Sequence, residues 1–106
     1  MQVLDFDTVD ARELFPGYHG RIVHSAQMTF ALWDVEPGAA FPEHSHPHEQ
    51  VVHLLDGEFE LTAGGTTSRL RPGTMAVVPP NTLHTGRALT RCRIMDVFSP
   101  TRDDYK

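Results

Sequence analysis

Residues 38–57 read GAAFPEHSHPHEQVVHLLDG, and this stretch carries most of the information about the fold. It places two imidazoles two positions apart, at His44 and His46. Alternate residues of a β-strand point to the same face, so both imidazoles can point into one interior. After a bend at Pro47, a second strand begins on which Gln50 has the inward parity. The stretch therefore predicts metal ligands on neighbouring strands.

A third imidazole, His84, follows the turn signal Pro79-Pro80-Asn81. We expect a separate strand to bring it to the first two, which gives a neutral set of three imidazoles and one amide oxygen. Imidazole-rich sites bind several transition metals, and the order of affinities among divalent ions does not choose between them. The sequence thus predicts one divalent transition metal ion (Zn, Ni, Fe, Cu or Mn), held by His44, His46, Gln50 and His84.

Other polar residues near these ligands receive different assignments. His48 and Glu49 would become ligands only if a bulge shifted the register of the strand, and we assign both to the rim of the site. His53 has the outward parity, so we interpret it as an interface histidine rather than a base. Cys92 has the inward parity and is expected to pack as a small apolar group.

The pattern of glycines and prolines predicts the fold class. Eight Gly and eight Pro residues separate short apolar runs that are rich in Val, Thr, Phe and Ile, as in strands joined by tight turns. Because closure removes exposed sheet edges, roughly seven to ten such strands favour an all-β jelly-roll barrel. Only Thr8–Leu14 suits a helix, with Thr8 as its N-cap.

The side-chain patterns of two predicted strands also indicate a subunit interface and a buried carboxylate. Gln27–Val35 is apolar on both faces, and one face carries Trp33. Sheet packing covers one face, while an exposed patch around a tryptophan is uncommon on monomers, so we predict Trp33 at the interface of a homodimer. In the last strand, Asp96 shares its face with Ile94 and Phe98. A carboxylate that faces a barrel interior needs a partner, a metal or a function.

Length and charge exclude several classes of function. The 106 residues fit one domain, 1–106, and the net charge of −5 with no basic run argues against nucleic-acid binding. No segment approaches the ~20 apolar residues of a membrane span. The single cysteine allows no internal disulfide, and the acidic N-terminus does not fit a signal peptide. We expect a soluble cytoplasmic protein with a small-molecule partner.

Two blocks of the sequence resemble the two signatures of the cupin superfamily: Gly38-x5-His44-x-His46-x3-Gln50-x6-Gly57 and Gly73-x5-Pro79-x-Asn81-x2-His84. The resemblance implies a double-stranded β-helix barrel, usually dimeric, with a metal inside one end. His44, His46 and His84 fall on the metal histidines of the family. Gln50 stands where most members have Glu, and its neutrality leaves the ion its full charge, which favours anionic substrates. Asn81 stands where a Gly is common.

The tail, residues 95–106, reads MDVFSPTRDDYK and resembles that of pectin-degradation cupins of the KdgF type, which promote linearisation of unsaturated uronates. The resemblance implies that Asp96, Phe98 and Arg102 bear on activity. Asp96 would move a proton, Phe98 would shape an apolar wall, and Arg102 would bind a substrate carboxylate through two hydrogen bonds. Alternatively, Asp96 and Arg102 form a structural ion pair that pins the tail to the barrel.

These observations predict a metal-dependent enzyme that opens, tautomerises or cyclises a small oxygenated substrate, such as a uronate or a keto–enol compound. The metal would stabilise developing negative charge on a substrate oxygen. Two alternatives stay open at this point. One is a cupin dioxygenase with a redox metal, and the other is a cupin that binds a small molecule without catalysis.

Overall fold

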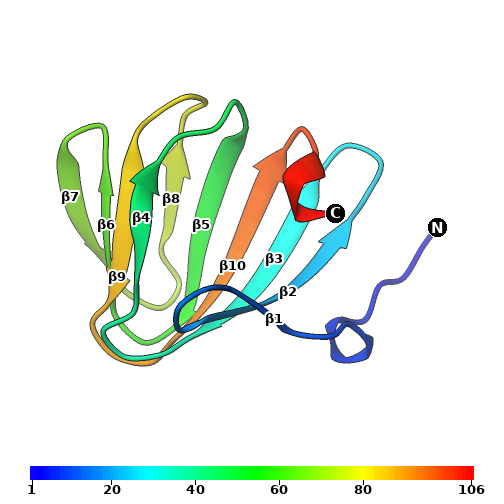
Figure 1. Cartoon of the computed structure of the whole chain (residues 1–106), viewed down its shortest axis with the longest axis horizontal. Coiled ribbons are helices and arrows are strands. Elements are labelled where there is room, and N and C mark those ends of the chain that lie inside the picture. Colours follow the sequence, from blue (N-terminus) through cyan, green and yellow to red (C-terminus); the bar gives the residue numbers. More distant parts are fainter.

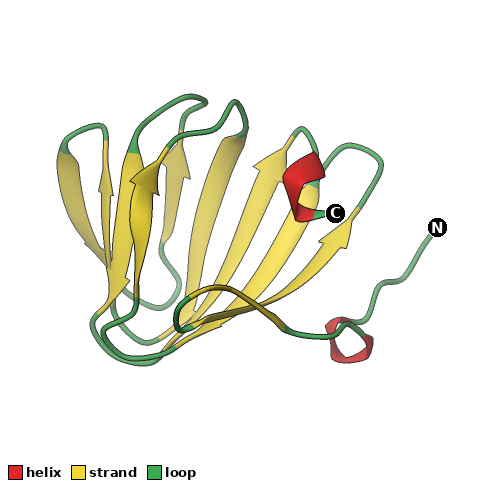
Figure 2. Cartoon of the chain, viewed as in Figure 1, coloured by secondary structure: helices red, strands yellow, loops and turns green.

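The computed structural model describes all 106 residues and consists almost entirely of short β-strands (Figures 1 and 2). Two 3-10 helices, η1 (Phe6–Thr8) and η2 (Asp103–Tyr105), lie near the two ends of the chain. The strands are β1 (Arg12–Phe15), β2 (Tyr18–His24), β3 (Thr29–Val35), β4 (Ala40–His44), β5 (Glu49–Asp56), β6 (Phe59–Ala63), β7 (Thr66–Leu70), β8 (Met75–Val78), β9 (His84–Ala88) and β10 (Cys92–Ser99). No helix is long and apolar enough to cross a membrane.

The ten strands form two antiparallel sheets. One has six strands in the order β1-β2-β3-β10-β5-β8, and the other has four in the order β4-β9-β6-β7. The loops between β4 and β5 and between β8 and β9 lie at the same end of the molecule as η2, at the top of Figure 1. The all-β jelly roll is therefore confirmed, and its topology gathers the predicted site residues at one end.

The core lies between the sheets and follows the alternation of each strand. On β5, Gln50, Val52 and Leu54 are buried, as their inward parity predicts. On β10, the inward face carries both Cys92 and Asp96. Side chains of the two sheets meet in one hydrophobic cluster, which includes Val52, Leu54, Ile94 and Phe98 from the larger sheet and Phe59, Leu61 and Ala88 from the smaller.

The helix predicted for Thr8–Leu14 is wrong. The chain forms a single 3-10 turn at η1 and then enters β1, which pairs with β2. Asp5 accepts a hydrogen bond from the backbone N–H of Asp7 at 2.9 Å. Such local side-chain bonds compete with a longer helix, and the pairing of β1 with β2 satisfies the backbone instead.

Trp33 lies inside the barrel rather than at a surface, so its predicted position at a subunit interface is also wrong. Its side chain is 3% exposed, its ring meets Tyr18 edge to face, and its indole N–H donates to Asp96 at 3.0 Å. Both faces of β3 are apolar, and alternation alone could not say which one points inward. The homodimer itself stays a prediction.

Gly57 closes the turn between β5 and β6 with a φ of 89°. This left-handed conformation disfavours any residue with a Cβ. A Cβ built at Gly57 would also overlap the carbonyl oxygen of Arg91. The last glycine of the first signature block is therefore required by both backbone conformation and space.

Candidate metal centre

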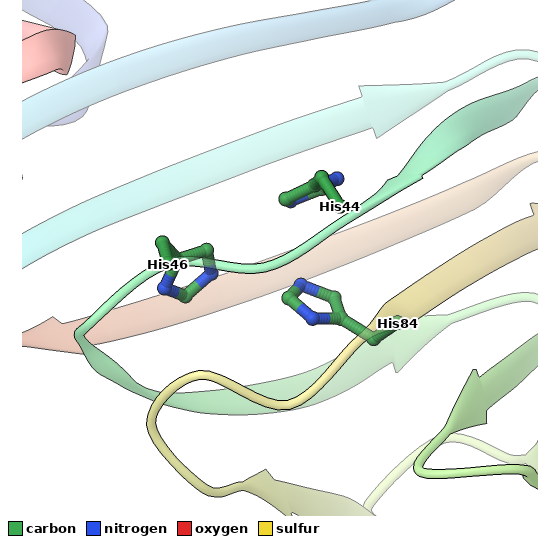
Figure 3. Close-up of side chains that lie close together, drawn as sticks. All are labelled: His44, His46 and His84. Carbon is green, nitrogen blue, oxygen red and sulfur yellow. The ribbon is translucent and has the colours of Figure 1, made fainter.

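Three imidazoles converge at one end of the barrel, and Figure 3 shows their rings around a common space. His44 ends β4, His46 lies in the following loop, and His84 begins β9. His44 and His84 face each other as paired residues of neighbouring strands. One ligand atom from each of the three lies within 4.8 Å of the others. The geometry thus joins the three histidines that the sequence marks as ligands.

Backbone carbonyls fix the orientation of two of these rings. His44 donates from Nδ1 to the carbonyl of Pro42, and His84 donates from Nδ1 to that of Thr82, each at 2.8 Å. A carbonyl can only accept, so the proton of each neutral ring resides on Nδ1 and Nε2 keeps its lone pair. His84 Nε2 is buried without any hydrogen-bond partner. A buried, unpartnered lone pair of this kind is what a metal ion would satisfy.

Gln50 completes the donor set from the opposite sheet. Its side chain is 5% exposed, and its Oε1 lies 3.0 Å from Nε2 of His46. Two donors at right angles, each about 2.1 Å from one ion, are about 3.0 Å apart. The amide oxygen is therefore spaced to share an ion with His46, and the residues present fit a transition metal.

Burial favours the neutral form of two of the imidazoles, His46 and His84. Burial and, after it, the nearby Arg102 guanidinium lower the pKa of His46 to about 4, against a hydrogen bond to Gln50 that raises it. Burial likewise lowers the pKa of His84. The neutral ring is the form that binds metal, so neither His46 nor His84 is an imidazolium that an incoming ion must first deprotonate at neutral pH.

A single backbone bond joins the two loops that carry the ligands. Asn81 donates its N–H to the carbonyl of His46 at 2.8 Å. Its φ of 60° lies in the left-handed region, where Asn is tolerated far better than most residues. This explains why Asn can replace the glycine that is common at this position of the signature, and it places His84 beside His46.

Asp96 lies next to this centre on β10. Its Oδ2 accepts from the Trp33 indole, whereas its Oδ1 is buried without a hydrogen-bond partner. Burial raises the pKa of Asp96 to about 7. The amide of Gln50, the hydrogen bond from Trp33 and the charge of Arg102 each lower this pKa, but they offset only part of the effect of burial. The carboxyl group can thus hold or release a proton near neutral pH.

Arg102 approaches the same space from the tail. The residue is 7% exposed, and its guanidinium lies 4.9 Å from the centre of the Phe98 ring and 3.9 Å from that of Tyr105. Its ion pair is made with Asp104, at 2.7 Å, rather than with Asp96. The backbone N–H of Arg102 donates to the Thr29 hydroxyl. The tail is pinned, but by these contacts and not by an Asp96–Arg102 pair.

One pocket, which opens to solvent, joins most of these groups: His44, Gln50, His84, Asp96, Phe98, Arg102 and Tyr105 all line it. Ten of its 15 lining residues are hydrophobic. The polar ones lie together at the metal end: His44, Gln50, His84, Asp96 and Arg102.

Comparison with known families decides the classification. The model of the cupin domain matches residues 31–98, which is more than half of the chain. The chain belongs to the cupin family. Both signature blocks lie within the matched residues, so the cupin motifs and the converging imidazoles describe the same site. A search of curated proteins gave no match.

Solved structures agree with this classification. KdgF from Halomonas sp. is similar at 29% identity, with a TM-score of 0.92 over 100% of this chain and 99% of that one. An RmlC-like cupin from Shewanella frigidimarina has 23% identity and a TM-score of 0.93, over 100% and 96% of the two chains. An oxalate decarboxylase from Bacillus subtilis has 18% identity and a TM-score of 0.83, over 92% and 29%. The protein is a small cupin that resembles KdgF.

Sequence reasoning missed three residues of this cupin site. Trp33 was assigned to the wrong face of β3, although it orients Asp96. Tyr105 and Asp104, which contact Arg102, follow the last strand in η2, where strand alternation says nothing about side-chain direction. A buried arginine requires a counter-charge nearby. This requirement is the one signal in the sequence that indicates an acidic partner for Arg102 in the tail.

Proposed function

We propose that this cupin is a metal-dependent enzyme that opens or tautomerises the ring of a small oxygenated acid, such as an unsaturated uronate. The observation that carries the proposal is one pocket lined by two imidazoles of the cluster, an acid with a free oxygen and a buried guanidinium. The likeness to KdgF supports the same class of substrate. A metal held by His44, His46, Gln50 and His84 would supply Lewis acidity toward a substrate oxygen.

Arg102 would bind and orient the substrate. Its cation is the only one among the residues that line the cavity, so it is the natural partner of a substrate carboxylate. Phe98 and the other aromatic side chains of the cavity offer flat apolar surfaces to the carbon face of a sugar ring. These contacts would place the reacting carbon near Asp96.

Asp96 would move the proton. Trp33 holds its Oδ2, and this bond leaves Oδ1 free to accept a proton from the substrate or to return one. Proton transfer by a positioned group contributes roughly 10²–10⁴-fold to a rate. The two oxygens of one carboxylate thus have separate tasks, orientation and proton transfer.

Asp96→Asn tests this assignment, because the amide keeps the shape of the carboxyl group but cannot act as a base. With an unsaturated galacturonate as substrate, we expect turnover to fall by about 10²–10⁴-fold while the metal content stays at the wild-type level. Asp103→Asn, an exposed tail residue with the same change of charge, is the control. Full activity of Asp96→Asn would refute the proton transfer.

Two outcomes with the wild type would favour a different function. Oxygen uptake would indicate a dioxygenase, and binding of the uronate without turnover would indicate a binding protein.

A further inference from the structure

Asp104 is the one acidic residue that forms an ion pair with the arginine of the cavity. Its Oδ2 accepts from Arg102 Nη2 at 2.7 Å, and its Oδ1 accepts from Nε at 3.3 Å. The two side chains differ sharply in exposure, since that of Asp104 is 57% exposed and that of Arg102 only 8%. The pair therefore spans the boundary between solvent and the cavity.

The geometry of this pair leaves one edge of the guanidinium free. A guanidinium has five N–H groups in a plane, and a carboxylate can bind either the Nε/Nη2 edge or the Nη1/Nη2 edge. Asp104 occupies the first of these edges. Nη1 has no partner within the protein, while Phe98 and Tyr105 cover the guanidinium at 4.9 and 3.9 Å. The free edge is thus fixed in direction.

The turn that carries Asp104 is itself fastened to the barrel. Arg12 of β1 donates from Nη2 to the carbonyl of Tyr105 at 2.9 Å, and His48 contacts the carbonyl of Thr101 through Nε2 at 3.2 Å. The Tyr105 ring packs edge-on against Trp33. Asp104 therefore acts from a fixed point and not from a free chain end.

We propose that Asp104 is the positioning residue for Arg102, which it holds with the Nη1/Nη2 edge directed into the cavity for a substrate carboxylate. This inference rests on the proposed function for its ligand. Asp96 lines the same pocket as Arg102 and feels the charge of its guanidinium, which lowers the pKa of Asp96 against the larger effect of burial. Asp104 thus gives Arg102 a counter-charge at the solvent side of the pocket, and Asp96 stays free of an ion pair.

Ligand-free protein provides the first test. The Nε–H of Arg102 should give a resolved, slowly exchanging signal in a ¹⁵N–¹H spectrum of the wild type, because it is buried and bound to Asp104. We expect Asp104→Asn to accelerate its exchange with water at least tenfold, and Asp103→Asn to leave it unchanged. Asp103 is the matched control, since it lies in the same turn and pairs with Lys106 instead. An Arg102 signal that exchanges as slowly in Asp104→Asn would overturn the proposal.

Binding and turnover provide the second test. With D-galacturonate as the bound probe and its unsaturated analogue as substrate, Asp104→Asn should raise Kd and KM about 10- to 100-fold, as for loss of a charge-assisted hydrogen bond, with a smaller change in kcat. Asp104→Glu should restore part of the affinity. In an Arg102→Lys background, Asp104→Asn should add less than twofold, because it acts only through the arginine. Additive losses in the double variant would overturn the positioning role.

The two tests separate failure of this inference from failure of the proposed function. If the wild type neither binds nor converts the uronates, the proposed function is wrong, and the exchange of the Arg102 Nε–H still decides whether Asp104 positions it. If the wild type binds them and Asp104→Asn binds them equally well, the positioning role is wrong and the proposed function stands.

Discussion

At the scale of single residues, the candidate metal centre depends most on His84. Its Nε2 is buried without a hydrogen-bond partner, and its Nδ1 already donates to the carbonyl of Thr82. We expect His84→Ala to weaken binding of the metal by more than about 100-fold, since even the loss of an outer hydrogen-bond partner costs 10–100-fold. Elemental analysis of untagged protein and titration with Zn²⁺ or Ni²⁺ would measure this loss. His53→Ala, on the outward parity of β5, is the control and should bind as the wild type does.

Asp96 makes the stability of the metal-free protein depend on pH. Its pKa is about 7 in the folded chain against an ordinary value of 3.8, so the folded state retains a proton that the unfolded state releases. The folded chain therefore loses stability as pH rises from 3.8 to about 7. Asp96→Asn removes this loss, so its gain over the wild type should be absent at pH 4 and on the order of 2–4 kcal/mol at pH 8.

Urea unfolding of both proteins in a chelator would measure that difference. The imidazoles titrate in both proteins, and taking the difference between them cancels most of their contribution. An equal gain at pH 4 and pH 8 would show that burial does not perturb Asp96 in this way.

The sequence predicts the four proposed ligands, and the structure brings their side chains together. The sequence does not predict the residues that support them. Alternation in the strands and the spacing of the signature blocks select His44, His46, Gln50 and His84. No local pattern shows that Trp33 holds Asp96, because those residues lie 63 positions apart and meet only after β3 and β10 pair. Long-range hydrogen bonds of this kind require the register of the sheet.

At the scale of elements, a comparison of Gly57 with Gly65 distinguishes two ways in which an added methyl group destabilises a turn, namely backbone strain and steric overlap. Gly57 and Gly65 have φ values of 89° and 80°, but only at Gly57 does a Cβ meet the backbone, while nothing lies within 4 Å of it at Gly65. We expect Gly65→Ala to cost about 1 kcal/mol from conformation alone. Gly57→Ala should cost about 3 kcal/mol or more, because the clash is with a carbonyl that cannot rotate away.

Chemical denaturation of the two variants beside the wild type would check this contrast. Equal losses of unfolding free energy would mean that the β5–β6 turn relaxes around the added carbon, and that space does not constrain Gly57.

Elements differ in how far sequence alone determines them. β5 and β10 alternate cleanly, so their inward faces were correctly predicted. β3 is apolar on both sides, and its orientation follows from the pairing with β2 and β10 rather than from its own residues. Thr8–Leu14 has weak preferences of either kind, and the chance to pair with β2 decides its conformation. Tertiary context thus prevails where local signals are balanced.

At the scale of the whole molecule, the outer face of the larger sheet is the candidate interface of the predicted homodimer. Met75 and Val77 of the edge strand β8 are 63% and 60% exposed, and Leu55 of β5 is 41% exposed. Exposed apolar patches commonly mark protein contacts. We expect the double variant Met75→Glu and Val77→Glu to shift the mass in solution from dimer to monomer.

Light scattering coupled to gel filtration would measure that shift. Thr67→Glu adds an exposed charge on β7 of the other sheet and should leave the mass unchanged. A wild type that is monomeric at micromolar concentration would refute the homodimer.

The four proposed ligands come from both layers of the molecule. His44 and His84 belong to the four-stranded sheet, while Gln50 lies in β5 of the six-stranded sheet. An ion held by all of them would cross-link the layers, and it would bind only the folded chain. By linkage, free metal at 1,000 times its Kd stabilises such a fold by about 4 kcal/mol, so a chelator should lower Tm markedly in the wild type and little in His84→Ala. We therefore expect metal starvation to act on this protein through its lifetime as well as its activity, as unfolded molecules become available to proteases.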